Sequence, residues 1–344
     1  MTDAELRQLA SALARLPVHA LSSVRAGGNN RIFRAQTPDG PLALKLYPSQ
    51  QADPRDRLGT EWRALSFLAK NGITGLPKPI ACDPGHNLAL YSWIEGQACP
   101  PGSGTWADTS RLAGFLTSLA PLGRLPDAQD LPLASAACPA PMDAFGQLQA
   151  RRNRLQAIDS DHPGLSVFLR TRFDPACARF FAAAANGLNQ AGIVGERALP
   201  PQRMLLSPSD FGLHNALRQP DGTLAFVDFE YFGWDDPVKA IADVILHPGS
   251  AFDDVCRQDF VAAMLPHMAA TDPDFVTRFH MLLPVYGLIW CLILLNEFLP
   301  ERWARRVMAG GRDDQKAEQD RQLKKAASLL DWIEGLHEHH IIAR

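Results

Sequence analysis

The part of this sequence best suited to chemistry has an aspartate, an asparagine five positions later and a second aspartate after a short apolar run. These residues are Asp210 and Asn215, within PSDFGLHNAL, and Asp228, at the end of LAFVD. Transfer of a phosphoryl group to a hydroxyl needs a carboxylate that accepts the hydroxyl proton and oxygen ligands that hold Mg²⁺. The spacing favours Asp210 as that base and Asn215 and Asp228 as metal ligands. Taken singly, the residues also fit ordinary turn chemistry, because Asp and Asn side chains bond local backbone.

A lysine and a glutamate earlier in the chain fit the same chemistry. In PLALKLY, Lys45 stands on the strand face opposite three leucines, where it is suited to bind phosphates. A solvated lysine on an edge strand gives the same pattern. Glu61 falls on the apolar face of a helix predicted over 54–70, and a charge on such a face needs a partner. Lys45 is a candidate for that partner, and Asp56 is the alternative carboxylate.

The elements that must position these residues begin with a β-rich part. Helices are predicted over 3–16 and 54–70. The predicted strands are ALSSVRA, RIFRAQT, PLALKLY, PKPIACD and LALYSW. The turn TPDGP between the second and third strands is typical of a hairpin. The segment IEGQACPPGSGTW, rich in Gly, Pro and Ser, predicts a linker.

The rest of the chain is predicted to be mostly helical, with an irregular stretch over 121–141 and one β-like interruption over 207–237. The predicted helices cover 107–120, 142–157, 163–190, 237–247, 253–267, 273–298 and 315–338. We therefore expect an α+β, bilobal fold. It has a small antiparallel β lobe over 1–93, a hinge over 94–106 and a large, mainly helical lobe over 107–344. Ligand sites often lie between such lobes.

The order of these motifs resembles that of the aminoglycoside phosphotransferase and choline kinase superfamily, the small-molecule kinase branch of the protein-kinase-like fold. That family carries H-G-D-x-x-x-x-N, then a hairpin, then I-D-F or I-D-W. The corresponding segments here read PSDFGLHN and VDFEYFGWDDP, and DFEY is similar to the choline and ethanolamine kinase version. The order of elements agrees over about 20–300, whereas the resemblance at the level of motifs covers 207–237.

The resemblance implies an ATP- and Mg²⁺-dependent enzyme that transfers the γ-phosphate to a hydroxyl of a small molecule, such as an amino alcohol, an aminoglycoside or a sugar. It implies that Lys45, paired with Glu61, binds the α- and β-phosphates. It also implies that the lobe over 1–93 binds the nucleotide through further residues. These are Gly27 and Gly28 of AGGNNRIF, as a phosphate loop, and Trp93 and Ile94 of YSWIEGQ, at a hinge that meets adenine. A plain hairpin turn explains the two glycines equally well.

Three residues of the catalytic segment depart from the family pattern. Pro208 stands where the family has a histidine that supports the loop, and Gly212 stands where it often has a histidine. His214 instead adjoins Asn215, where it can reach a phosphate or serve as an ordinary loop residue. The alternative function is therefore a nucleotide-binding pseudokinase or regulatory module without turnover. A protein kinase fits less well, because no A-P-E-like segment and no activation loop of useful length follow Asp228.

Acidic residues near the motif are candidates for contact with the substrate. Glu230 and Asp235 can draw a cationic acceptor or orient the loop. Glu297 follows an apolar helix, where a plain surface position is the simpler interpretation. Asp236, followed by a proline, predicts a helix start. Asp243 is a candidate to brace the catalytic loop.

Composition narrows the class of protein. The 344 residues carry a net charge of −3 and no basic run with interleaved aromatics, so we expect no nucleic-acid partner. The six cysteines form no C-x-x-C pair and fit a reducing compartment.

The N-terminal segment lacks the apolar core of a signal peptide. The most apolar stretch, 281–295, is shorter than the roughly 20 residues of a membrane span. We therefore expect a buried helix and a cytoplasmic protein without a membrane partner. Neither the acceptor nor the oligomeric state can be read from the sequence.

Overall fold

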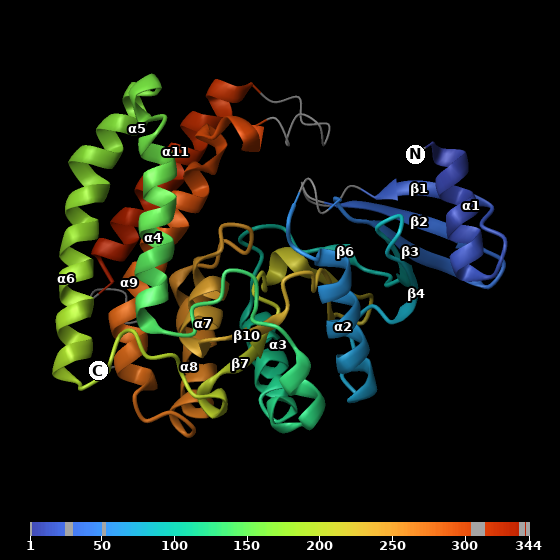
Figure 1. Ribbon diagram of the computed structural model, residues 1–344, viewed down its shortest axis with the longest axis horizontal. Coiled ribbons are helices and arrows are strands. Elements are labelled where there is room, and N and C mark those ends of the chain that lie inside the picture. Colours follow the sequence, from blue (N-terminus) through green and yellow to red (C-terminus); the bar gives the residue numbers. More distant parts are fainter. Residues whose placement is uncertain (1, 25–29, 50–52, 304–313, 337–340, 342–344) are drawn as a thin grey trace.

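Five antiparallel strands form the sheet of the N-terminal part. The computed structural model describes residues 2–24, 30–49, 53–303, 314–336 and 341 (Figure 1). The strands, in the order in which they pair, are β1 (Ala20–Val24), β2 (Arg31–Thr37), β3 (Gly40–Leu46), β5 (Leu88–Ser92) and β4 (Pro79–Asp83). Each neighbouring pair is antiparallel. The predicted antiparallel sheet is therefore confirmed.

Alternation along β3 decides which helix each side chain faces. Leu44 packs with α1 (Asp3–Ala14) in a core cluster on one face of the sheet. Tyr47, just after β3, belongs to the core cluster that includes α2 (Arg57–Lys70). Because alternate strand residues share a face, Lys45 points with Tyr47 toward α2. Figure 1 shows α1 on the side of the sheet that is away from the helical part, and it shows α2 next to the helical part.

The second part of the chain is mostly helical, which confirms the predicted α+β class. Its helices include α3 (Trp106–Leu119), α4 (Pro141–Gln156), α5 (Pro163–Phe168), α6 (Asp174–Gln190), α7 (Pro237–Leu246), α8 (Asp254–Ala269), α9 (Phe275–Leu294) and α11 (Gln315–Glu334). A π-helical segment, Leu169–Phe173, joins α5 to α6, so the helix predicted over 163–190 is continuous but not uniform. Two 3₁₀ turns, Leu122–Arg124 and Pro126–Asp130, occupy the predicted irregular stretch.

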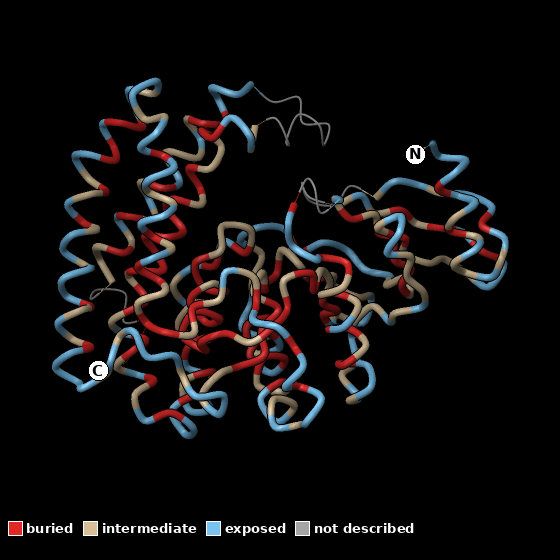
Figure 2. The backbone as a smooth tube through the Cα atoms, viewed as in Figure 1, coloured by how far each residue is buried: buried red, intermediate tan, exposed pale blue. Residues whose placement is uncertain are grey.

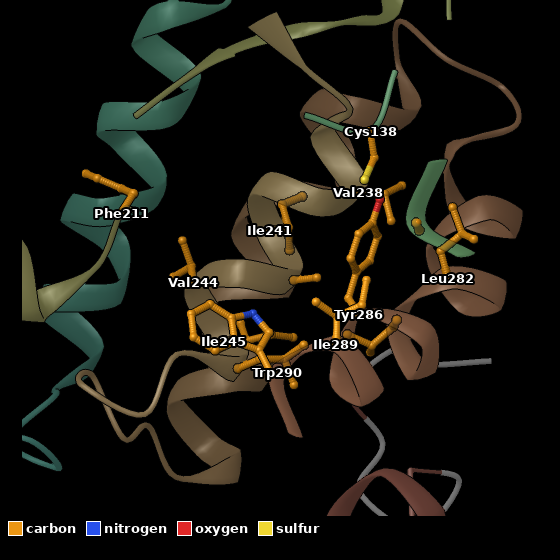
Figure 3. Packing of buried hydrophobic residues seen from close by; sticks show 14 of the residues in the cluster. Cys138, Phe211, Val238, Ile241, Val244, Ile245, Leu282, Tyr286, Ile289 and Trp290 are labelled. Atoms are coloured by element: carbon orange, nitrogen blue, oxygen red, sulfur yellow. The ribbon is translucent and has the colours of Figure 1, made fainter. Parts of the chain in front are cut away.

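Helix α9 lies at the centre of the helical part and packs against α4, α6, α7 and α11. With the turn that follows, it spans Phe275–Phe298 and is the one helix among the described residues that is long and apolar enough to cross a membrane. Its most apolar window is 72% buried inside the protein. Figure 3 shows Tyr286 and Ile289 of α9 packed near Ile241 and Ile245 of α7. Figure 2 shows the buried chain gathered in this middle region. Internal packing thus accounts for the apolar sequence of α9.

The predicted linker differs from expectation, because it contains a strand. Gln97–Ala98 forms β6, which pairs with β8 (Ala216–Arg218) and so adds a third strand to the hairpin of β8 and β9 (Leu224–Phe226). Gly96 allows this approach, since a Cβ there would lie 3.0 Å from the carbonyl oxygen of Arg218. A two-residue strand is too short to show the period-two pattern, so the sequence could not reveal it.

Candidate active site

The predicted base and metal ligands lie at one end of a β-hairpin. The strands around the loop are β7 (Leu205–Ser207) paired with β10 (Gly233–Asp235), and β8 paired with β9. The backbone N–H of Val227 donates to the carbonyl oxygen of Asn215 over 2.9 Å, which brings Asn215 beside the residue that precedes Asp228. The Asn215 amide nitrogen donates to the carbonyl oxygen of Asp210 over 2.8 Å. The structure therefore brings Asp210, Asn215 and Asp228 together.

Lys45 connects the sheet to this hairpin. Its Nζ lies 2.6 Å from Oε2 of Glu61 and 2.6 Å from Oδ1 of Asp228, with Glu230 at 3.8 Å. Burial alone would lower the pKa of the Lys45 ammonium, but the carboxylates of Asp228, Glu61 and Glu230 outweigh burial and raise the pKa above its ordinary value. Lys45 is therefore a buried, permanently charged cation. The predicted ion pair with Glu61 is present, and Asp56 instead caps α2 by accepting from the Gly59 N–H.

Glu61 ties α2 to the segment that follows Asp228. Its Oε2 accepts from the Tyr47 hydroxyl at 2.7 Å in addition to Lys45, and its Oε1 accepts from the Phe229 N–H at 3.2 Å. Glu61 is 2% exposed, so these donors satisfy a carboxylate that has left water. Burial, followed by the charge of Glu61, raises the pKa of Tyr47 well above its usual range, so Tyr47 stays a donor.

The residues predicted to hold Mg²⁺ offer the ligand atoms that this ion prefers. Asp228 adopts φ 70°, a left-handed conformation that is uncommon for a residue with a side chain and is often associated with functional sites. Its side chain is 32% exposed, and its carboxylate belongs to a group with Glu61 and Glu230 whose oxygens lie within 4.8 Å of one another. The contact of Asn215 with Asp210 uses the amide nitrogen and leaves the amide oxygen for a cation. Hard oxygen ligands of this kind fit Mg²⁺.

Asp210 has a partly exposed carboxylate, which His214 of the same loop contacts. Its side chain is 35% exposed, and His214 Nε2 lies 2.8 Å from its Oδ1. Burial alone would raise the pKa of this carboxyl, but the hydrogen bond from His214 and the neighbouring His247 outweigh burial and lower the pKa to about 2. An ionised carboxylate that solvent can reach is suited to accept a hydrogen bond from a hydroxyl.

Residues 20–273 match the phosphotransferase enzyme family. This stretch contains the five-stranded sheet, Lys45 and the hairpin of β8 and β9 with Asp210, Asn215 and Asp228, which we call the catalytic hairpin. The chain belongs to this family. A match of this extent identifies the family without specifying the acceptor.

Solved structures of phosphotransferases share the fold along nearly the whole chain. A choline/ethanolamine kinase family protein from Mesorhizobium loti superposes with a TM-score of 0.59 and 18% identity, over 99% of this chain and 98% of that one. Spectinomycin phosphotransferase APH(9)-Ia, solved with ADP and spectinomycin, gives 0.61 and 13% over 97% and 99%. The choline kinase LicA from Streptococcus pneumoniae gives 0.59 and 14% over 96% and 98%. No curated protein gives a significant match to the chain. At these identities the likeness shows the protein-kinase-like fold.

Glu230 is held by other residues of the chain. It is 3% exposed, one oxygen contacts the guanidinium of Arg57, and the other accepts from the Asn30 amide at 2.6 Å. Arg57 in turn contacts Asp53. Burial, and then the nearby charge of Asp228, raises the pKa of the Glu230 carboxyl. Substrate contact by Glu230 stays a prediction, and it requires these contacts to open.

Asp235 does not fit its predicted contact with substrate. It is 0% exposed, and it accepts from the backbone N–H groups of Cys138 and Asp236 at 2.9 and 2.8 Å. Lys239 Nζ lies 3.2 Å away. Burial raises the pKa of its carboxyl. Because no substrate atom can reach a completely buried carboxylate, Asp235 is a structural residue. Glu297 lies in the turn after α9, half-buried, and its predicted substrate role stays untested.

Asp236, the residue before α7, and Asp243, within α7, have different roles. Asp236 caps the helix, as predicted, by accepting from the Val238 N–H at 2.8 Å. Asp243 accepts from Lys239 Nζ at 2.7 Å and from Trp290 Nε1 at 2.9 Å. Both donors lie outside the catalytic loop, so Asp243 ties α7 to α9 and the prediction that it braces the loop is wrong.

The predicted hinge residues follow β5, the strand that lies between β3 and β4 in the sheet. Trp93 and Ile94 come directly after β5 and before β6, where the chain passes from the sheet to the catalytic hairpin. The guanidinium of Arg34 stacks on the Trp93 ring at 5.2 Å and contacts Glu95 at 3.1 Å. Adenine contact there stays a prediction. The predicted phosphate-loop glycines, Gly27 and Gly28, lie outside the described residues.

Sequence reasoning missed several residues around the site. Arg57, which holds Glu230, and His247, whose Nε2 lies 3.4 Å from Asp210 Oδ1, carried no motif. Ser250 accepts from the Leu213 N–H at 3.1 Å and is also absent from the prediction. Each lies far along the chain from its partner, so no local spacing marks it. A charged residue in the first turn of an apolar helix was the one available signal, and it applies to Arg57 alone.

Proposed function

We propose that this protein transfers the γ-phosphate of ATP, with Mg²⁺, to a hydroxyl group of a small molecule. The observation that carries the proposal is the contact of Lys45 Nζ with Glu61 and Asp228, 2.6 Å from each. A strand, a helix and the catalytic hairpin meet at that point, next to the loop that holds Asp210. A charged lysine among carboxylates is suited to bind nucleotide phosphates when the metal takes over part of the negative charge.

Each residue has a definite role in this proposal. Lys45, oriented by Glu61, binds the α- and β-phosphates. Asn215 and Asp228 would hold Mg²⁺, which when bound neutralises charge on the phosphates. Asp210 accepts a hydrogen bond from the acceptor hydroxyl, orients it and takes its proton. Positioning and electrostatics supply most of the acceleration in phosphoryl transfer, so a weakly basic carboxylate suffices.

The acceptor classes to test are amino alcohols, aminoglycosides and sugars. Two of the structural neighbours are choline kinases or members of that kinase family, and one was solved with spectinomycin. Those compounds are known for the neighbours, and they guide the choice of the panel for this chain. A cytoplasmic location is part of the proposal, because it supplies ATP.

Thermal unfolding with nucleotide tests the proposed Mg·ATP site. A ligand present at about 100 times its Kd stabilises the folded state by roughly 2.7 kcal/mol, which raises the melting temperature measurably. We expect ATP to raise the melting temperature in the presence of Mg²⁺ and to do so much less in EDTA. The Asp228→Asn variant is expected to lose the Mg²⁺-dependent part. If ATP raises the melting temperature equally with and without Mg²⁺, in both the unaltered protein and the Asp228→Asn variant, the assignment of the metal ligands is contradicted.

A nucleotide-binding module without turnover is the second candidate, and Pro208 in place of the family histidine is the observation that favours it. Such a module shows the same thermal shift as an enzyme. The two are separated by ADP formation in the presence of the acceptor panel, which the module does not catalyse.

A further inference from the structure

Two imidazole rings from different segments contact the carboxylate of Asp210. His214, in the catalytic loop, places Nε2 at 2.8 Å from Oδ1, and His247, just after α7, places Nε2 at 3.4 Å from the same oxygen. The rings stack with centroids 3.6 Å apart and planes 13° from parallel. Both contacts fall on Oδ1, so neither histidine competes for Oδ2. The exposed fractions of the two side chains are 14% and 18%, so the pair is well shielded from solvent.

The backbone N–H of Gly249 and the carboxylate of Asp210 determine which ring nitrogens carry protons. The Gly249 N–H donates to Nδ1 of His247 at 3.0 Å, so the proton of a neutral ring must lie on Nε2, toward Asp210. Burial, and then the neighbouring His214, lowers the pKa of His247 to about 3, which keeps the ring neutral. His247 therefore directs its Nε2–H toward Oδ1 of Asp210, 3.4 Å away, without adding a charge.

Ser250 completes the same arrangement for His214. Its Oγ accepts from the Leu213 N–H at 3.1 Å and lies 3.4 Å from Nδ1 of His214. Asp210 is ionised and can only accept, so Nε2 of His214, 2.8 Å from Oδ1, carries a proton and donates it. Asp210, His214 and His247 lie close enough together to suggest a metal site. Protons on both Nε2 atoms argue against that use, because a metal needs the bare nitrogen.

Two glycines make room for the stacked rings. A Cβ on Gly212 would lie 2.6 Å from Ser250 Oγ and 3.0 Å from the His214 ring. A Cβ on Gly249 would lie 2.8 Å from Cβ of His214 and 2.9 Å from the His247 ring. Contacts under 3.0 Å cannot persist without a shift of the neighbours. Gly212, where the family often has a histidine, therefore leaves the space that the ring of His214 occupies.

We propose that His214 and His247 are positioning residues that hold Oδ1 of Asp210, so that Oδ2 is presented to the acceptor hydroxyl. Their contact supports the Asp210 side chain where Pro208 cannot supply a histidine side chain and Asp243 is engaged by Lys239 and Trp290. The inference rests on the proposed function, because the orientation of Asp210 matters only if it acts on an acceptor. Ring N–H donors suit this task, since they hold one oxygen of the carboxylate in place and leave the other free.

Substitutions that keep the stack and remove the donor test the role. In His214→Phe and His247→Phe, we expect kcat to fall roughly 10- to 100-fold, because small losses of orientation have effects of that size. The KM for ATP is expected to stay within about twofold, because neither residue contacts the proposed phosphate site. The Gln variants place an amide nitrogen near the position of Nε2 and are expected to recover most of the lost turnover.

A matched control is His86→Phe. His86 forms a similar histidine–aspartate contact, with Asp83 at 2.7 Å, but on the exposed turn between β4 and β5. Its loss is expected to leave kcat unchanged. Unchanged kcat in both Phe variants at positions 214 and 247 would overturn the proposal. So would an equal loss in the Phe and Gln variants, since a lost donor would then not be the cause.

The ¹⁵N spectrum of the imidazole rings tests the contact in the unaltered chain, without any need for turnover or for stable variants. We expect His247 to be neutral with its proton on Nε2. A neutral ring with its proton on Nδ1 would overturn the proposed contact, because Nε2 would then have no proton to direct at Asp210. If the chain binds Mg·ATP and never forms ADP, the proposed function fails, while the spectrum still decides whether the histidines hold Asp210 as inferred.

Discussion

Replacing Asp210 with asparagine is expected to lower kcat by roughly 10²–10⁴-fold, the usual contribution of general-base catalysis. The amide oxygen can still accept from His214, so the loop is expected to keep its fold, but an amide cannot take the proton of the acceptor hydroxyl. ATP affinity is expected to stay near that of the unaltered chain. Steady-state ADP formation at saturating acceptor gives kcat, and the ATP-dependent thermal shift reports binding.

Asp221→Asn is the matched control for this substitution. Asp221 belongs to the turn of the same hairpin and accepts only local hydrogen bonds, from Thr223. The same change of charge there is expected to leave kcat within about twofold, as for most surface substitutions. If Asp210→Asn retains full turnover, or if both variants lose it equally, Asp210 is not the base.

Replacing Lys45 with methionine is expected to affect both ATP binding and stability. Removing one partner of a buried ion pair costs about 3–5 kcal/mol, because the remaining carboxylate is left unpaired in the interior. Glu61, at 2% exposed, would be that carboxylate. A hydrogen bond to a charged group is worth about 1.5–3 kcal/mol, which corresponds to a loss of affinity for ATP of roughly 10- to 100-fold. Urea unfolding and nucleotide titration measure the two effects separately.

Lys239→Met separates the loss of stability from the loss of binding. Lys239 is also a buried lysine between two carboxylates, with Asp243 at 2.7 Å and Asp235 at 3.2 Å, but it lies on α7. We expect a similar fall in the free energy of unfolding and no change in ATP affinity beyond that of the folded fraction. Equal loss of affinity in the two variants would mean that Lys45 acts through the fold and not through the phosphates.

The sequence predicted the parts of the site whose geometry follows from local periodicity. Lys45 could be placed because strand residues alternate, and Glu61 because it stood on an apolar helix face that required a partner. The pair of Asp210 and Asn215 could be placed because one short loop contains both. In each case a regular element or a fixed spacing determines where the side chain lies.

The parts that the sequence could not predict depend on contacts between distant segments. Asp235 looked like an exposed charge near the site, and only the folded chain shows that it is buried, with backbone N–H groups donating to one of its oxygens. The contact of His247 with Asp210 joins α7 to the catalytic loop through a stacked ring. Asp243 was expected to brace the catalytic loop, but its carboxylate accepts a hydrogen bond from Trp290 on α9 instead. Tertiary packing decides these partners, and no local pattern encodes it.

Transfer of labelled phosphate from ATP to a small molecule measures the proposed activity most directly. The chain is incubated with γ-labelled ATP, Mg²⁺ and a panel of amino alcohols, aminoglycosides and sugars, and the products are separated by charge. We predict that label appears in at least one acceptor, that EDTA abolishes the transfer and that Asp210→Asn reduces it by at least about 10²-fold. Label that stays in ATP with every acceptor, in a chain that Mg·ATP stabilises, would contradict the proposed phosphotransferase and favour a nucleotide-binding module.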